Sequence, residues 1–210
     1  MKTPEWFTEI TTIVLASIIL AVTYSFRNTR LFIWAGISFL IIITLNVLAK
    51  KIIAYNFEAK ARIKFWGWFQ FGFGKKAHFK KPLPMLWLPL VLSFFTKGLL
   101  NFWFGILEFD IKPKTERVSR RHGLYRFSEM TDWHIALIVA AGIVINLIAS
   151  IVGYVAGFET FARLSIWFAA WSLIPISSLD GSKLFFGSRA LWFTMLVIVG
   201  IFLGYSLAVI

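Results

Sequence analysis

The sequence contains no cysteine, few histidines and few acidic residues. Without cysteine there is no disulfide framework, no thiol nucleophile and no cysteine-ligated metal site. The only histidines are His78, His122 and His134, and no two of them are spaced as ligands on one turn of a helix. A zinc site built from these histidines is therefore disfavoured, as is a serine hydrolase with a histidine base.

Long apolar runs are abundant instead. Of the 210 residues, 59% are apolar, whereas about 45–50% is usual in a soluble domain. The net charge of +12 comes from Lys and Arg in the stretches that flank the apolar runs, as is typical of the cytosolic ends of membrane helices. We therefore expect a polytopic integral membrane protein whose partner is the lipid bilayer, with no role in binding nucleic acid.

The pattern predicts one all-α membrane domain over residues 1–210. A basic, aromatic segment at residues 50–81 is expected to be cytosolic or interfacial, and its FWGWFQFGFG run, residues 65–74, can form an edge strand that anchors at the interface or binds substrate. Residues 110–132 form a basic loop. The five predicted membrane helices cover residues 10–26, 31–49, 133–158, 161–174 and 190–208.

Residues 83–109 are apolar but interrupted by Pro84, Pro89 and the Thr96–Gly98 insert, so each half is too short to span as a helix. Two interpretations remain, a re-entrant hairpin and a single crossing. A hairpin would place nearly all Lys and Arg on one side of the membrane and leave Arg27, Arg30 and Arg163 opposite. The positive-inside rule therefore favours the hairpin, with the N-terminus and the basic loops in the cytosol.

Asp180 stands between two apolar segments, and a carboxylate at membrane depth marks a candidate functional site. Pro175 and Gly181 flank it and predict a break in the helix. The stretch SLIPISSLDG, residues 172–181, resembles the aspartate motif of the site-2 protease family of intramembrane zinc metalloproteases. The resemblance implies that this aspartate is the third zinc ligand, and that an H-E-x-x-H helix upstream supplies the other two.

The corresponding upstream stretch is NVLAKKIIAYNF, residues 46–57, where the frame matches but the reactive residues differ. Asn46 stands at the first histidine position, Val47 at the general base and Lys50 at the second histidine. Asn is a poor zinc ligand, a protonated Lys repels the metal, and Val can neither accept a proton from water nor orient it. We therefore expect no catalytic residue, no metal and no other cofactor at this site.

The same positions suggest what replaces the metal. If both motifs converge as in that family, the Lys50 ammonium can pair with Asp180 while Asn46 supplies a hydrogen bond. In the alternative, Lys50 extends to the lipid headgroups and Asp180 faces a wet vestibule. Asn146 lies in AAGIVIN, residues 140–146, which resembles the family's A-G-P-x-x-N segment, and it either positions substrate or forms an inter-helix hydrogen bond.

The sequence favours a non-catalytic relative of site-2 proteases that binds or regulates transmembrane segments or a partner protease. One alternative is an active intramembrane protease that holds zinc with atypical ligands. Another is a small-solute transporter or channel, because broken helices and buried polar residues also mark transport sites.

Overall fold

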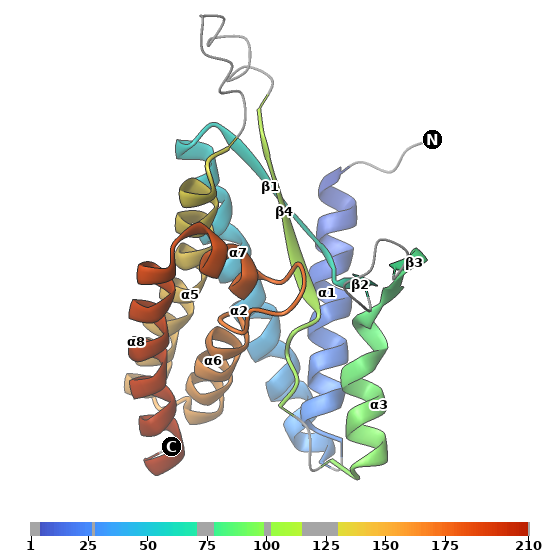
Figure 1. The fold of residues 1–210 in the computed structure, drawn as a ribbon. Helices are drawn as coiled ribbons and strands as arrows, with labels where there is room; N and C mark the ends of the chain where they lie inside the picture. Colours follow the sequence, from blue (N-terminus) through green and yellow to red (C-terminus); the bar gives the residue numbers. More distant parts are fainter. Residues whose placement is uncertain (1–4, 27, 71–77, 99–101, 115–129, 210) are drawn as a thin grey trace, which may run out of the picture.

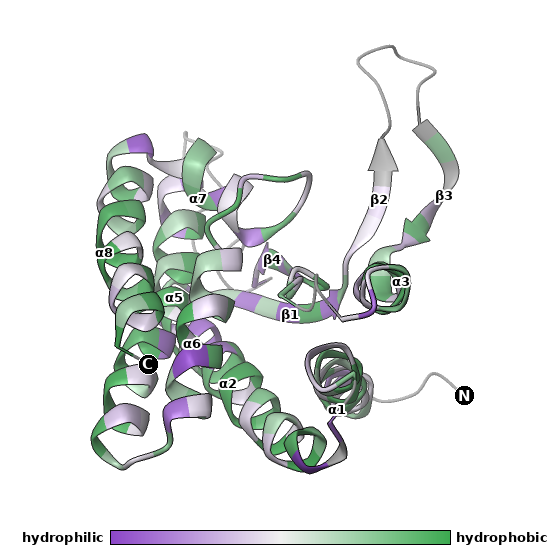
Figure 2. Cartoon of the chain, turned by 90° about the horizontal axis from the view of Figure 1, so that it is seen from below, coloured by the Kyte–Doolittle hydropathy of each residue, from purple (hydrophilic) through white to green (hydrophobic). Residues whose placement is uncertain are grey.

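A computed structural model describes residues 5–26, 28–70, 78–98, 102–114 and 130–209 (Figure 1). Within them, four helices are long and apolar enough to cross a membrane: α1 (Glu5–Tyr24), α2 (Thr29–Asn56), α5 (Asp132–Val155) and α8 (Arg189–Ala208). Most residues of these four helices are apolar (Figure 2). This is the pattern of a membrane protein, in which lipid contacts the outer faces.

α1 and α2 form an antiparallel pair joined by a short turn. The Asn28 side chain begins α2 by accepting a hydrogen bond from the Arg30 N–H at 3.1 Å. Small buried residues, including Ala16, Ala21 and Ala35, let the two backbones approach closely. Each of the two helices runs from one end of the molecule to the other (Figure 1).

α2 continues seven residues beyond the predicted end at residue 49. The prediction took Lys50 and Lys51 as the point where the helix leaves the membrane. Each lysine instead has a carboxylate partner, Asp180 for Lys50 and Glu9 for Lys51. Both lysines are good helix formers and lie inside α2, which continues to Asn56.

The fold is mostly helical, consistent with the predicted all-α class, and it also contains short strands. β1 (Ala59–Phe65) pairs antiparallel with β4 (Leu107–Pro113), and β2 (Gly67–Gln70) pairs with β3 (His78–Pro84). β2 contains part of the aromatic run for which a strand was predicted, whereas residues 71–77 lie outside the described residues. β1 and β4 lie near the middle of the molecule, between the α1–α3 side and the α5–α8 side (Figure 2).

Residues 83–98 and 102–109 form two limbs that run in opposite directions (Figure 1). The descending limb holds the short 3-10 helix η1 (Met85–Trp87) and α3 (Leu88–Phe95), and the returning limb is extended from residue 102 into β4. α3 packs on α1, where the Ser93 hydroxyl donates to the Thr23 carbonyl at 3.1 Å. The tip lies beside Phe26, so Lys97 is at the end of the molecule opposite to the one where the charge argument placed it.

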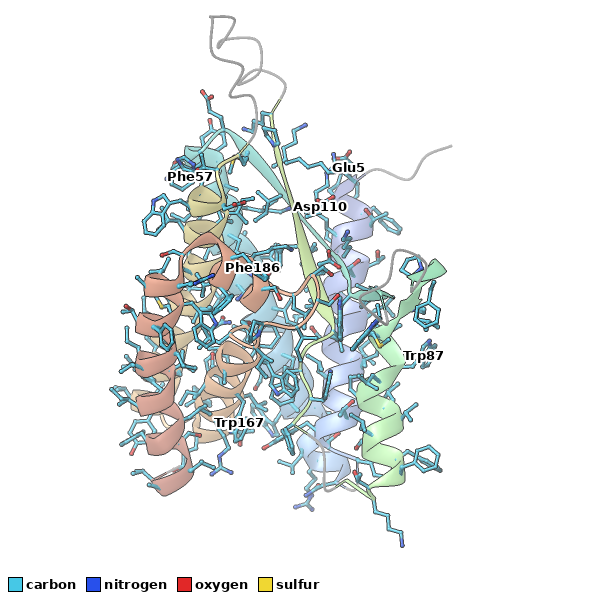
Figure 3. All side chains as sticks on the ribbon, in the orientation of Figure 1. Glu5, Phe57, Trp87, Asp110, Trp167 and Phe186 are labelled. Carbon is cyan, nitrogen blue, oxygen red and sulfur yellow. The ribbon has the colours of Figure 1, made fainter. Side chains whose placement is uncertain are left out.

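The C-terminal half contains α5, α6 (Glu159–Trp171), α7 (Asp180–Gly187) and α8. α6 has 13 residues, fewer than the roughly 20 needed to span a bilayer, because the chain breaks before Pro175. The prediction of five spanning helices is therefore replaced by four within the described chain. Residues 115–129 of the predicted basic loop lie outside the described residues. Phe57, just past α2, and Trp167, in α6, mark the two ends of the bundle (Figure 3).

Candidate functional site

The break predicted around Pro175 is present. α6 ends at Trp171, residues 172–179 form an irregular loop, and α7 begins at Asp180. The Trp192 indole of α8 donates to the Leu173 carbonyl at 2.9 Å, which satisfies a backbone group freed by the break. At Gly181 a Cβ atom would overlap the backbone of Leu173 and Ile174, so only glycine fits there.

Asp180 is the first residue of α7 and is 7% exposed. The N–H groups of a helix's first turn carry partial positive charge, so this position favours a carboxylate. α7 packs against α5, and β4 contributes Phe109 to the same site. The ion pair with Lys50 brings Asp180 next to α2.

Lys50 and Asp180 form a buried ion pair between α2 and α7. Lys50 is 1% exposed, and its Nζ also lies 3.7 Å from the centre of the Phe109 ring. The predicted pairing is confirmed, and the alternative in which Lys50 reaches the headgroups is wrong. The second oxygen of Asp180, Oδ1, is buried and has no hydrogen-bond partner among the described residues.

Asn46 does not supply the hydrogen bond that was predicted for Asp180. Its amide donates instead to the Gly142 carbonyl of α5 at 2.9 Å. A Cβ at Gly142 would stand 2.8 Å from Asn46 Nδ2 and would overlap the Lys50 side chain. Because Gly142 has no side chain, both Asn46 and Lys50 of α2 fit against α5 at this point.

Val47 and Asn146 lie next to this site in different surroundings. Val47 is 4% exposed and belongs to the apolar core formed with α1 and the returning limb. Asn146 is fully buried, and its carbonyl accepts a hydrogen bond from the Ser165 hydroxyl of α6 at 3.0 Å. Within the described residues its side-chain amide forms no hydrogen bond, so the predicted inter-helix bond is made by the backbone instead.

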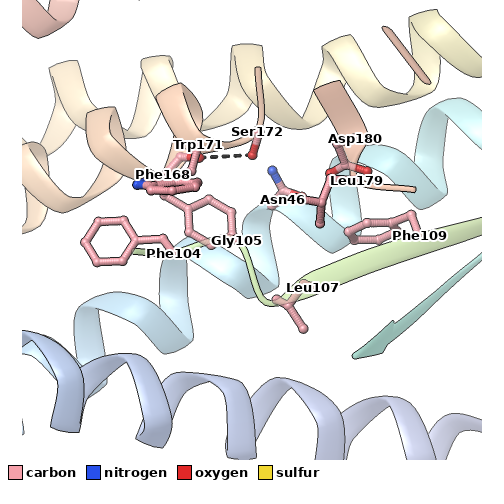
Figure 4. A pocket seen from close by; sticks show the side chains of 10 residues that line it. All are labelled: Asn46, Phe104, Gly105, Leu107, Phe109, Phe168, Trp171, Ser172, Leu179 and Asp180. Atoms are coloured by element: carbon pink, nitrogen blue, oxygen red, sulfur yellow. Dashed lines mark hydrogen bonds between the residues drawn. The ribbon is translucent and has the colours of Figure 1, made fainter. Parts of the chain in front are cut away.

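A cavity of about 20 Å³ adjoins the ion pair and is lined by Asn46, Phe109 and Asp180 together with residues of the α6–α7 connection and the returning limb (Figure 4). A volume of this size accommodates about one water molecule.

The residues at the site do not fit a catalytic zinc ion. A bound metal would have to share the Asp180 carboxylate with a lysine ammonium, and neither Asn46 nor Val47 supplies a strong ligand or a base. The described chain contains no cluster of three His, Asp or Glu side chains that could hold a metal.

His134, at the start of α5, contacts Thr131 and the Phe57 ring. The side chain of His78 and the whole of His122 lie outside the described residues.

Sequence reasoning missed Phe109 and the role of Lys183. The Lys183 ammonium donates to the Phe109 carbonyl, so two cations contact the same residue, one at its ring and one at its backbone. A signal for Phe109 exists in the alternation of apolar and charged residues from Leu107 to Lys112, which is typical of a strand.

The molecule is thus a mostly helical membrane protein with a lysine–aspartate pair in its interior. No protein-family model, no curated protein and no solved structure matches this chain.

Proposed function

We propose that this chain is a non-catalytic membrane protein, resembling site-2 proteases, that binds transmembrane segments of other proteins. The observation that carries the proposal is the buried ion pair of Lys50 and Asp180. At the positions where the resemblance implies a zinc ion and a water-activating base, this chain has an ammonium, an amide and an aliphatic side chain. A carboxylate neutralised in this way anchors helices and activates no water.

A second cavity supports the binding role. It has a volume of about 350 Å³ and lies between the lower part of α1, the returning limb, α6 and α8. Phe102 and Trp167 form an aromatic pair on its wall, with ring centres 6.0 Å apart, and Arg163 also lines it. The Ser206 hydroxyl on the same wall has no hydrogen-bond partner within the described chain. A helix passing alongside would bury aromatic area of Phe102 and Trp167.

We propose further that the N-terminus and the end of the molecule carrying β1 and β4 face the cytosol, with the C-terminus on the other side. The basic residues of β1 and β4 gather at this end, whereas the Asn28 turn and Lys97 lie at the other. This distribution agrees with the positive-inside rule.

The test is photocrosslinking in proteoliposomes with one synthetic transmembrane peptide of about 21 residues. A photoreactive phenylalanine analogue replaces Phe102 in the cavity or, as the control, Ile201 of α8, which is 68% exposed and does not line the cavity. We expect crosslinks to the intact peptide from position 102 that exceed those from position 201 at least severalfold. Equal yields would reject the binding role, and hydrolysis of the peptide by the pure protein would favour the protease alternative.

A further inference from the structure

A separate cavity, with a volume of about 410 Å³, opens at the end of the molecule where α1 begins and α2 ends. Its lining includes four basic and two acidic side chains. The acidic ones are already paired, Glu9 with Lys51 and Glu5 with Arg62, the latter at 2.5 Å. The other two basic residues, Lys60 and Lys114, have no carboxylate partner within the described residues. The cavity therefore carries an excess of positive charge.

The ladder of β1 and β4 shows how this excess arises. Alternate residues on one face are exposed, and at the far end of the ladder Lys64 stands opposite Glu108, with 3.4 Å between their charged atoms. In the middle, Arg62 stands opposite Asp110, near Glu5 at the start of α1 (Figure 3). At the cavity end Lys60 stands opposite Lys112, which pairs with Asp110 at 3.1 Å. Lys60 therefore has no carboxylate opposite it on the ladder, and an anion bound at this end would supply the missing counter-charge.

The position of the cavity corresponds to the boundary between membrane and water. Two large aromatic side chains line it, Trp6 in the first turn of α1 and Tyr55 in the last turn of α2. They are 61% and 70% exposed, and Trp and Tyr are enriched at the depth of the lipid headgroups. The Lys114 ammonium lies 4.3 Å from the centre of the Tyr55 ring, which holds the cation at the rim of the cavity.

We propose that this cavity binds the phosphate-bearing headgroup of an anionic phospholipid, with Lys60 and Lys114 as the phosphate ligands. Lys51 and Arg62 stay paired with their carboxylates and form the walls. The acyl chains would run down the apolar outer surface of α1 and α2, where Ile10 and Ile52 are exposed. Free inorganic phosphate could bind the same two lysines. Unlike a phospholipid, it has no acyl chains to bury on α1 and α2, and this difference distinguishes the two ligands. The site is independent of the proposed role in binding transmembrane segments.

The experiment is a lipid titration of the full chain in detergent, followed by native mass spectrometry. The probes are phosphatidylglycerol and phosphatidylcholine with identical acyl chains, and inorganic phosphate as a competitor. At about 1 kcal/mol for each basic residue near an anionic surface, Lys60→Gln with Lys114→Gln is expected to weaken phosphatidylglycerol binding about tenfold to thirtyfold. Lys60→Arg with Lys114→Arg should bind phosphatidylglycerol as the wild type does.

The matched control is Lys64→Gln with Lys112→Gln, which removes the same charge from β1 and β4 at two positions outside the cavity. This control should change the affinity less than twofold, and phosphatidylcholine should bind weakly to every variant. Equal losses in the two glutamine variants would show that only diffuse surface charge acts and would overturn the proposal. Complete displacement of the lipid by millimolar phosphate would overturn the assignment to a lipid. Normal unfolding temperatures of the variants establish that each is folded.

Discussion

A lysine ammonium and an aspartate carboxylate both lose several kcal/mol of hydration when they are buried, so each one stabilises this fold only while the other is present. Here Lys50 links α2 to the start of α7, and its contact with the Phe109 ring links both to β4. The packing of α2, α7 and β4 against one another therefore depends on the Lys50 ammonium.

The first prediction concerns this dependence. Lys50→Met is expected to lower the free energy of unfolding by about 3–5 kcal/mol, because it leaves a buried carboxylate without a counter-charge. Lys50→Met with Asp180→Asn removes both charges and should recover at least a third of that loss. Unfolding of the wild type, Lys50→Met, Asp180→Asn and the double variant in detergent measures the coupling. A double variant with the summed losses of the two single variants would show that the charges do not interact.

The second prediction concerns Gly142. Gly142→Ala places a methyl group against Asn46 and Lys50 and is expected to destabilise the fold by about 1–3 kcal/mol. Gly200→Ala in α8 is the control, because a Cβ there meets nothing within 4 Å and alanine favours the helix. The unfolding temperatures of the two variants give the comparison. Equal effects would contradict the close approach of α2 and α5 at Gly142.

At this scale the sequence predicts much of the site. The lysine at position 50 and the carboxylate at position 180, placed in the two stretches that carry the resemblance, predict that Lys50 and Asp180 pair. The sequence does not predict which polar atom Asn46 contacts, because the Gly142 carbonyl and the Asp180 carboxylate are both plausible acceptors until α5 is placed.

At the scale of elements, the pairing of β1 with β4 decides where the returning limb lies. Residues 59–65 and 107–112 both alternate between apolar and charged residues, so each strand has a signal in the sequence. The long apolar runs on either side obscured that signal. The register also joins segments more than forty residues apart, and no local pattern specifies such a pairing.

The third prediction tests this register. The chain has no cysteine, so a pair of introduced cysteines reports a single contact. Lys64→Cys with Glu108→Cys places the two thiols directly opposite each other and should form a disulfide readily under mild oxidation. Lys64→Cys with Lys112→Cys is displaced along the ladder by four residues, roughly 13 Å, and should not. Efficient crosslinking of the displaced pair would show that the register is wrong.

The whole molecule has its N-terminal and C-terminal ends at opposite ends of the helices (Figure 1). Helix length and composition predict the four long helices. They do not predict that α6 stops after 13 residues, since its apolar run continues to Pro175. In the loop that follows, Gly181 permits close packing against Leu173 and Ile174, and the Trp192 indole donates to the Leu173 carbonyl.

The fourth prediction concerns orientation in the membrane. Asn28→Cys lies in the turn between α1 and α2, and Lys112→Cys lies at the other end on β4. A membrane-impermeant maleimide applied to intact cells should label position 28, and should label position 112 only after the membrane is opened. Labelling of position 112 in intact cells would invert the proposed orientation.

The central claim is that an ion pair stands where the resemblance implies a metal. Measuring the zinc content of the purified protein tests this claim most directly. The full chain would be purified without chelator in the presence of zinc, beside an Asp180→Asn variant, and both would be analysed by elemental mass spectrometry. The claim predicts the same background level in both, far below the one zinc per chain of a catalytic site. About one zinc per wild-type chain that is lost in the variant would contradict it.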